Sequence, residues 1–312
     1  MTSKLHISTS PHIHHKRSTA SIMLNVILAL LPTTIAGILI FGLRAAAVIA
    51  VCVATCIISE FLFNIIIKKE QTISDFSAAV TGLILALNLP ANIPFWQAIV
   101  GSVFAIIIVK AIFGGLGKNL VNPAITARVF MILSFGAMAS IANPIADTTS
   151  SATPLTNIAE GNPPELIDLF LGKHGGSIGE VCSLALLLGG IYLIATKIIS
   201  WHIPVSFIGA TFILSLLFNG FDFYSATALV LSGGLFIGAV FMATEYVTSP
   251  TTKAGKIFFG VGAAFITVII RIYGNYPEGV SFAILFMNIL TPYIDVWTRR
   301  KLFGGKKREK TN

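Results

Sequence analysis

One short segment of the chain concentrates side chains that carry oxygen atoms. Residues 147–156 read Asp-Thr-Thr-Ser-Ser-Ala-Thr-Pro-Leu-Thr, so seven of these ten residues are Asp, Ser or Thr. Hydroxyl and carboxylate oxygens are potential ligands, but they are also typical of turns. By residue type alone the segment predicts a turn that leads into a helix, with Thr153 as the N-cap and Pro154 at the first helical position.

A second segment, residues 114–123, is rich in glycine and asparagine and reads Gly-Gly-Leu-Gly-Lys-Asn-Leu-Val-Asn-Pro. Its backbone amides and the side-chain amides of Asn119 and Asn122 could hold a flat polar heterocycle or a phosphate. The order of glycines, lysine and hydroxyl residues does not fit a P-loop. Taken alone, a tight loop with capping asparagines is the simpler interpretation.

A few charged residues lie inside or at the ends of apolar stretches, where charge is costly and often functional. They are Glu60, Glu245, Asp295 and Lys110. Glu60 could bind a cation or a proton, which would place it on an ion path, or it could pair with a neighbour. We expect Lys110 to extend its ammonium group to the membrane surface.

Cysteine and histidine do not form a recognisable metal site. Cys52, Cys56 and Cys182 lack the spacing of zinc or iron–sulfur ligands. The histidines lie in the N-terminal arm, in a loop and at the end of an apolar stretch, so none is placed to ligate a haem within a membrane. Residues 11–16 hold three histidines that could bind a metal, but a solvated arm is the simpler interpretation. We predict no metal site and no catalytic residue.

The composition shows what kind of protein must position these groups. Of 312 residues, 55% are hydrophobic and 11% are charged, and the mean hydropathy is +0.86. Soluble domains carry about 25% charged residues. These values exclude a soluble globular protein, a disordered chain and a disulfide scaffold, and they predict an all-α polytopic membrane protein.

Ten apolar stretches approach the ~20 residues that a helix needs to cross the hydrocarbon. They are residues 21–41, 45–66, 74–90, 95–113, 123–141, 180–196, 203–219, 225–245, 257–272 and 280–296. The third is interrupted by Asn88-Leu89-Pro90, and the eighth contains Gly233, Gly234 and Gly238. Such breaks are tolerated where the backbone is buried in protein or lines a cavity.

The positive charges predict the orientation of these spans. With the N-terminus inside and ten alternating spans, 18 of the 21 Lys and Arg residues fall on the cytoplasmic side. The positive-inside rule therefore favours cytoplasmic N- and C-termini. The net charge of +8 is explained by this distribution, so we predict no nucleic-acid partner.

Five spans precede the long loop and five follow it, so the two halves have opposite orientation. Paired broken third helices in two such halves are typical of inverted repeats around a central site. We predict five regions: an N-terminal cytoplasmic arm, a first five-helix repeat, an extracytoplasmic loop, a second five-helix repeat and a basic cytoplasmic tail. Their bounds are 1–20, 21–141, 142–179, 180–297 and 298–312.

Several sequence blocks, spread over nearly the whole chain, match those of one membrane-protein family. They are Ser10-Pro11-His12 with His14, Thr19 and Ile22-Met23; Gly117-Lys118-Asn119; Asn122-Pro123-Ala124 with Arg128-Val129-Phe130; Leu171-Gly172-Lys173 with residues 175–180; Phe241-Met242-Ala243-Thr244 with Thr248-Ser249-Pro250; and Tyr276-Pro277-Glu278-Gly279-Val280 with Phe282, Ala283 and Asn288. In these blocks the chain resembles the NqrB/RnfD family, and within it the D subunits of Rnf electron-transport complexes.

The resemblance implies two flavins. A flavin transferase would join FMN through its phosphate to a threonine in the pattern Asp, two variable residues, Ser or Thr, usually Gly, then Ala-Thr. The matching positions are Asp147, Ser150, Ala152 and Thr153. Thr153 is thus the implied covalent acceptor, although Ser151 replaces the usual glycine and Thr156 is a rival. The family also implies a non-covalent riboflavin, for which Asn119 and Asn122 are the matching residues.

On this resemblance we expect an inner (cytoplasmic) membrane subunit that passes electrons by flavin between ferredoxin and NAD, coupled to Na⁺ or H⁺ movement. The ferredoxin and NAD sites would lie on partners among subunits A, B, C, E and G. Two alternatives stay open. One is the B subunit of the sodium-translocating NADH:quinone oxidoreductase, whose longer N-terminal extension is not seen here. The other is a small-solute channel or secondary transporter with the same inverted-repeat layout.

Overall fold

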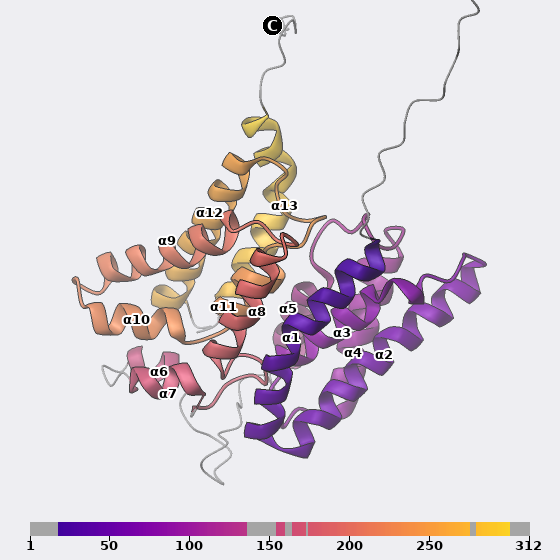
Figure 1. The fold of residues 1–312 in the computed structure, drawn as a ribbon, viewed down its shortest axis with the longest axis horizontal. Helices are drawn as coiled ribbons and strands as arrows, with labels where there is room; N and C mark the ends of the chain where they lie inside the picture. The colour runs from indigo at the N-terminus through magenta and orange to yellow at the C-terminus, as the bar shows by residue number, and fades with distance from the viewer. Residues whose placement is uncertain (1–17, 136–153, 160–163, 173, 275–278, 300–312) are drawn as a thin grey trace, which may run out of the picture.

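The computed structural model describes residues 18–135, 154–159, 164–172, 174–274 and 279–299. Within these ranges all regular structure is helical (Figure 1). The all-α part of the predicted fold class is therefore confirmed for the described residues. The motif residues Asp147, Ser150, Ala152 and Thr153 lie outside them.

The first half of the chain supplies the helices drawn in indigo and violet in Figure 1. They are α1 (Thr19–Phe41), α2 (Leu43–Ile67), the 3₁₀ turn η1 (Ile73–Asp75), α3 (Ser77–Leu87), α4 (Phe95–Val103), the π-helix η2 (Phe104–Ala111) and α5 (Pro123–Phe135). Helix α1 begins where the Ser18 side chain accepts a hydrogen bond from the Ser21 amide. Helix α3 has 11 residues and is thus about 16 Å long, roughly half of the hydrocarbon thickness.

Two short helices, α6 (Pro154–Ala159) and α7 (Leu166–Leu171), precede the second half. The second half contains α8 (Ser183–Ala195), α9 (His202–Phe218), α10 (Phe223–Leu231), α11 (Leu235–Ile237), the π-helix η4 (Gly238–Met242), α12 (Lys253–Tyr273) and α13 (Val280–Thr298). Helix α6 begins at Pro154, as the proline position predicts.

Among the residues that the structure describes, four helices are long and apolar enough to cross a membrane by length and composition: α1, α2, α12 and α13. Helix α10 and the α11–η4 segment pass the same test together, but they meet at a bend of 63°. The other apolar helices are shorter. Each of the ten predicted stretches overlaps a helix, and the predicted breaks at Asn88-Leu89-Pro90 and Gly233-Gly234 are present. The number of ten spans stays a prediction.

The two halves form bundles that lie side by side. In the first, α2 packs against α3 and α4, and in the second α9 packs against α12 and α10. The bundles meet where α1 packs on α8 and where α5 contacts α13. A Cβ atom at Gly189 of α8 would overlap the carbonyl oxygen of Ala29 in α1. Glycine at this position therefore permits the close helix contact that joins the halves.

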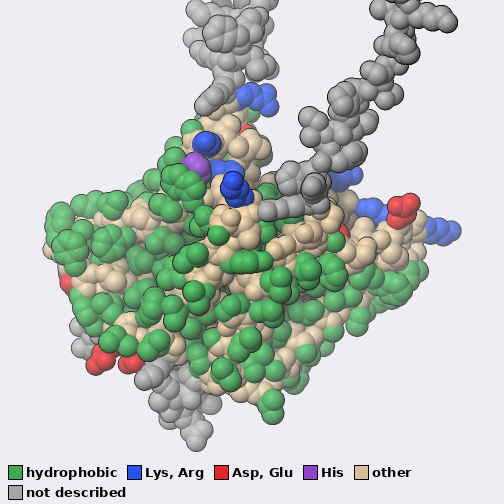
Figure 2. Space-filling view, viewed as in Figure 1, with side chains coloured by type: hydrophobic (Ala, Val, Ile, Leu, Met, Phe, Trp, Pro, Cys, Tyr) green, Lys and Arg blue, Asp and Glu red, His purple; other side chains and the backbone are tan. Residues whose placement is uncertain are grey.

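The outer surface is strongly apolar. Leu39, Leu43 and Ile66 are 79%, 87% and 77% exposed, respectively. Figure 2 shows a broad hydrophobic surface across the visible face of the molecule, with Lys and Arg gathered toward the end where α1 begins and α13 ends. An exposed apolar surface of this extent needs lipid or another protein to cover it. Together with the apolar helices, it identifies a multi-pass membrane protein.

Candidate functional site

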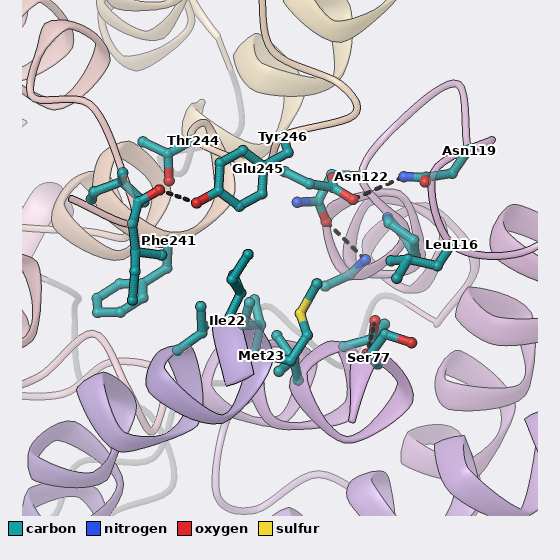
Figure 3. Close-up of a pocket in the computed structure, with 18 of the residues that line it drawn as sticks. Ile22, Met23, Ser77, Leu116, Asn119, Asn122, Phe241, Thr244, Glu245 and Tyr246 are labelled. Carbon is teal, nitrogen blue, oxygen red and sulfur yellow. Dashed lines mark hydrogen bonds between the residues drawn. The ribbon is translucent and has the colours of Figure 1, made fainter. Parts of the chain in front are cut away.

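A cavity lies where the two bundles meet, and we call it the asparagine cavity. It contains about 760 Å³ of space not filled by atoms, part of which is open to the surroundings of the protein. Figure 3 shows its wall, to which α1, α3, the turn before α5 and the segment after η4 all contribute. Its apolar lining includes Ile22, Met23, Ile84 and Phe241, and its polar lining includes Ser77, Lys110, Asn119, Asn122, Thr244 and Glu245.

Asn122 holds the start of α5 and also ties the two halves together. Its Oδ1 accepts hydrogen bonds from the Ala124 and Ile125 amides at 3.0 and 3.2 Å, which makes it the N-cap. Its Nδ2 donates to the Met242 carbonyl at the end of η4, at 3.2 Å. The capping role considered for this asparagine is therefore present, and the same side chain lines the cavity.

Asn119 makes a second link between the halves. Its Nδ2 donates to the Val121 carbonyl and, at 2.9 Å, to Oε1 of Glu245 (Figure 3). Glu245 also accepts from the Thr248 hydroxyl at 3.0 Å. The Asn119 side chain is buried, so this hydrogen bond is protected from water. The structure thus brings the two asparagines to one cavity with a carboxylate beside them.

The turn before these asparagines depends on glycine. Gly114, Gly115 and Gly117 have φ angles of +113°, +95° and +87°, a region that L side chains rarely adopt. The Lys69 ammonium donates to the Gly114 carbonyl at 2.7 Å and thereby anchors the turn to the end of α2. This geometry positions the polar end of the asparagine cavity.

Glu60 has a buried partner that the sequence did not reveal. The Lys110 ammonium lies 3.0 and 3.2 Å from the two Glu60 carboxylate oxygens, and both residues are almost fully buried. The Thr72 hydroxyl donates to the same carboxylate at 2.7 Å. The expectation that Lys110 extends to the surface is wrong, because Glu60 and Ser77 hold its ammonium inside the protein.

Two arginines that sequence reasoning did not assign to a site stabilise the broken helices. Arg271 of α12 donates to the Leu229 and Ser232 carbonyls at the end of α10, at 2.6 and 3.0 Å. Arg128 of α5 donates to Oδ1 of Asn88, just after α3, at 2.6 Å. A cation at a helix C-terminus is favoured by the helix dipole. The signal available in the sequence was a charged residue within an apolar stretch.

The short helix after Thr153 packs at one of these breaks. Leu155 of α6 is buried, and a Cβ atom at Gly233 would lie 2.9 Å from its Cδ1 and 2.7 Å from Nη2 of Arg271. Gly233 has a φ angle of +72°. Glycine at this bend therefore allows both the backbone turn and the close approach of α6.

Comparison with known proteins points to one family. The model of the NQR2, RnfD, RnfE family matches residues 6–304. The chain is 47% identical to the D subunit of the Na⁺-translocating ferredoxin:NAD⁺ oxidoreductase complex of Acetobacterium woodii, covering 98% of this chain and 97% of the relative. It is 38% identical to the D subunit of the proton-translocating ferredoxin:NAD⁺ oxidoreductase complex of Clostridium ljungdahlii, with 96% of each covered. The D subunit of the ion-translocating oxidoreductase complex of Escherichia fergusonii is 34% identical, with 96% of this chain and 99% of the relative covered.

Proposed function

The chain belongs to the NQR2, RnfD, RnfE family, and on that premise we propose that it is the flavin-carrying membrane subunit of an ion-translocating ferredoxin:NAD⁺ oxidoreductase complex. The observation that carries the proposal is the asparagine cavity. It lies between the halves of the chain and combines apolar walls with amide, hydroxyl and charged groups. The names of the relatives supply the reaction and the assembly.

The asparagine cavity has the chemistry for a non-covalent riboflavin. Phe241 and Ile84 would contact the apolar face of a flat ring, and Asn119 and Asn122 would hydrogen-bond its polar edge. Bound there, flavin would supply one- and two-electron chemistry that no side chain provides. The protein's part is to hold the ring, orient its polar edge and exclude water.

We propose Thr153 as the attachment point of a covalent FMN, placed there by a flavin transferase. The support is the pattern of Asp147, Ser150, Ala152 and Thr153, together with the buried Leu155 at the start of α6. Leu155, two residues after Thr153, is held against the bend at Gly233.

The proposed topology has ten spans, two inverted repeats and both termini on the cytoplasmic side of the inner membrane. It is supported by the overlap of each predicted apolar stretch with a helix in the described residues, by equivalent packing within the two bundles and by the basic side chains at one end in Figure 2. The asparagine turn would then face the cytoplasm and Thr153 the outside. Two flavins at opposite sides would let the subunit pass electrons between partner subunits, which we propose are A, B, C, E and G.

Ion movement needs a polar route, and we propose that Glu60 lies on it. A second cavity beside α2, which we call the glutamate cavity, has about 1150 Å³ of unfilled space, part of it open to the outside, and is lined by Glu60, Asn64, Thr72 and Lys110, among others. Carboxylate, amide and hydroxyl oxygens can coordinate Na⁺ or hydrogen-bond water, and the carboxylate can also accept a proton. The coupling ion can therefore be either of the two that the relatives' names give.

The test is to produce the chain together with its flavin transferase and to separate its flavins by acid precipitation. We expect a yellow fluorescent band on a denaturing gel that is lost in Thr153→Ala and kept in Thr156→Ala. We also expect riboflavin in the acid supernatant, retained in Thr153→Ala and strongly reduced in Asn122→Ala, with Asn219→Ala as the control away from the cavity. A fluorescent Thr153→Ala band would exclude Thr153 as the acceptor, and a supernatant without flavin would exclude the riboflavin site.

A further inference from the structure

Lys110 is placed between the two cavities. It lines the asparagine cavity together with Ser77 and Asn122, and it lines the glutamate cavity together with Glu60 and Thr72. Its side chain is 3% exposed, so its charge is screened by these neighbours rather than by water. It lies in the π-helical segment η2, and π-helical turns often occur at functional positions.

The contacts of Lys110 divide between the two sides. Its ammonium donates to both Glu60 oxygens, at 3.0 and 3.2 Å, and to the Ser77 hydroxyl at 2.6 Å. The Ser77 hydroxyl in turn donates to the Asp75 carboxylate. The ammonium thus has one partner that belongs to the glutamate cavity and another that belongs to the asparagine cavity.

Glu60 would keep a polar environment if Lys110 turned away. The Thr72 hydroxyl donates to Glu60 and accepts from the Asn64 amide at 3.1 Å, and all three side chains line the glutamate cavity. Their oxygens could receive a monovalent cation in place of the ammonium. The carboxylate can therefore exchange one positive partner for another without leaving its position.

We propose that Lys110 couples the charge of a flavin in the asparagine cavity to cation binding at Glu60. The proposal rests on the proposed function, because it requires a flavin in that cavity. When a ferredoxin-type donor delivers electrons through the complex, Lys110 turns its ammonium toward the added negative charge on the asparagine-cavity side. Glu60, now less neutralised, takes up Na⁺ or H⁺ from the glutamate cavity. Lys110 keeps its proton, and one cation taken up at Glu60 balances one negative charge added to the flavin. With Na⁺ no covalent bond changes, whereas with H⁺ one carboxylate oxygen gains an O–H bond to a proton supplied by water in the glutamate cavity.

Opposite effects of two substitutions distinguish coupling from a purely structural ion pair. Lys110→Met removes the positive charge beside the ring, so the flavin becomes harder to reduce. Glu60→Gln removes the negative charge that competes for Lys110, so the flavin becomes easier to reduce. Local damage to the pair would shift the two variants in the same direction. Reciprocity also requires that a cation bound at Glu60 makes the flavin easier to reduce.

The experiment is a spectroscopic redox titration of the purified full-length chain carrying Thr153→Ala, so that only the non-covalent flavin is titrated. We expect the ratio of reduced to oxidised flavin at a fixed potential to fall at least tenfold in Lys110→Met, which is about 30 mV for a two-electron couple. This ratio should rise in Glu60→Gln, stay near that of the parent in Lys110→Arg, and change less than about twofold in Lys253→Met, which removes an exposed charge at the start of α12.

Raising Na⁺ against choline at constant ionic strength, or lowering the pH, should raise the parent's potential, and one of these two responses should be smaller in Glu60→Gln than in the parent. Shifts of the same sign in Lys110→Met and Glu60→Gln would overturn the proposal, as would Na⁺ and pH responses that are the same in the parent and in Glu60→Gln. If Lys110→Met does not retain flavin, a flavin potential in Glu60→Gln equal to that of the parent would overturn the proposal. A parent chain without non-covalent flavin would instead refute the proposed function.

Discussion

Replacing Lys110 with methionine would leave the Glu60 carboxylate charged and buried, with the Thr72 hydroxyl and no ammonium beside it. The reverse change, Glu60→Met, would leave the Lys110 ammonium buried with the Ser77 hydroxyl. Each single substitution therefore removes one charge and strands the other. The double substitution removes both and fills the space with apolar side chains of similar length.

The size of the effect follows from the 3.0 Å separation of the charged atoms. With an effective dielectric constant of about 20, Coulomb's law gives an attraction of about 5 kcal/mol at this distance. Measured losses on removing one partner of a buried pair are about 3–5 kcal/mol, because the other charge stays desolvated. Replacing both partners with apolar residues is often neutral or stabilising. We expect each single variant to lose about 3–5 kcal/mol and the double variant to lie within about 1 kcal/mol of the parent.

The buried cysteines of α2 provide the assay, since Cys52 and Cys56 become reactive toward a thiol dye only when the helix is exposed. At roughly 2 °C per kcal/mol, the single variants should unfold about 6–10 °C below the parent. The exposed control Lys118→Met should unfold within about 1 °C of it. Two results would refute the argument that Glu60 and Lys110 neutralise each other: single variants as stable as the parent, or a double variant whose loss of stability equals the sum of the two single losses.

Three further predictions concern the contacts between helices. Gly189→Ala should destabilise the protein by about 1–3 kcal/mol, because the new Cβ atom meets the backbone of α1. Gly209→Ala is the control and should leave the stability unchanged, because no atom lies within 4 Å of the added Cβ. The thiol-dye assay measures both variants. Arg271→Leu should lower the free energy of unfolding by about 1–3 kcal/mol, because the carbonyls at the end of α10 lose their hydrogen-bond donor. Amide hydrogen exchange at the end of α10 should become faster, and unchanged exchange there would contradict this role of the arginine. Asn122→Ala should cost about 1 kcal/mol of stability through the lost N-cap of α5, and a stability equal to that of the parent would contradict it.

The sequence predicted the helical elements better than their lengths. Hydrophobic runs and proline or glycine interruptions located a helix in each of the ten apolar stretches, including the break before Pro90 and the bend at Gly233. They did not predict α7, which lies in the segment expected to be a loop. The lengths of the helices were harder to predict, because an apolar residue just outside a helix cannot be distinguished in the sequence from an apolar residue within the helix. The stretch 74–90, for example, contains a helix only from Ser77 to Leu87. The π-helical geometry of residues 104–111 has no signature in a continuous apolar run.

The candidate site was predictable in part. The glycine spacing and the two asparagines located the turn that lines the asparagine cavity, because left-handed backbone and side-chain amides leave a clear residue pattern. The partner of Glu60 could not be found, because Lys110 lies 50 residues away and only the packing of η2 against α2 brings them together. Thr153 was proposed from a motif alone, since the turn chemistry of its neighbours does not distinguish an acceptor from a helix cap.

The intact mass of the purified protein, followed by peptide mapping, tests the central claim most directly. The account predicts an added mass equal to FMN minus water, located on the peptide that contains Thr153 and absent from Thr153→Ala. An unmodified parent protein, produced together with its flavin transferase, would contradict the account.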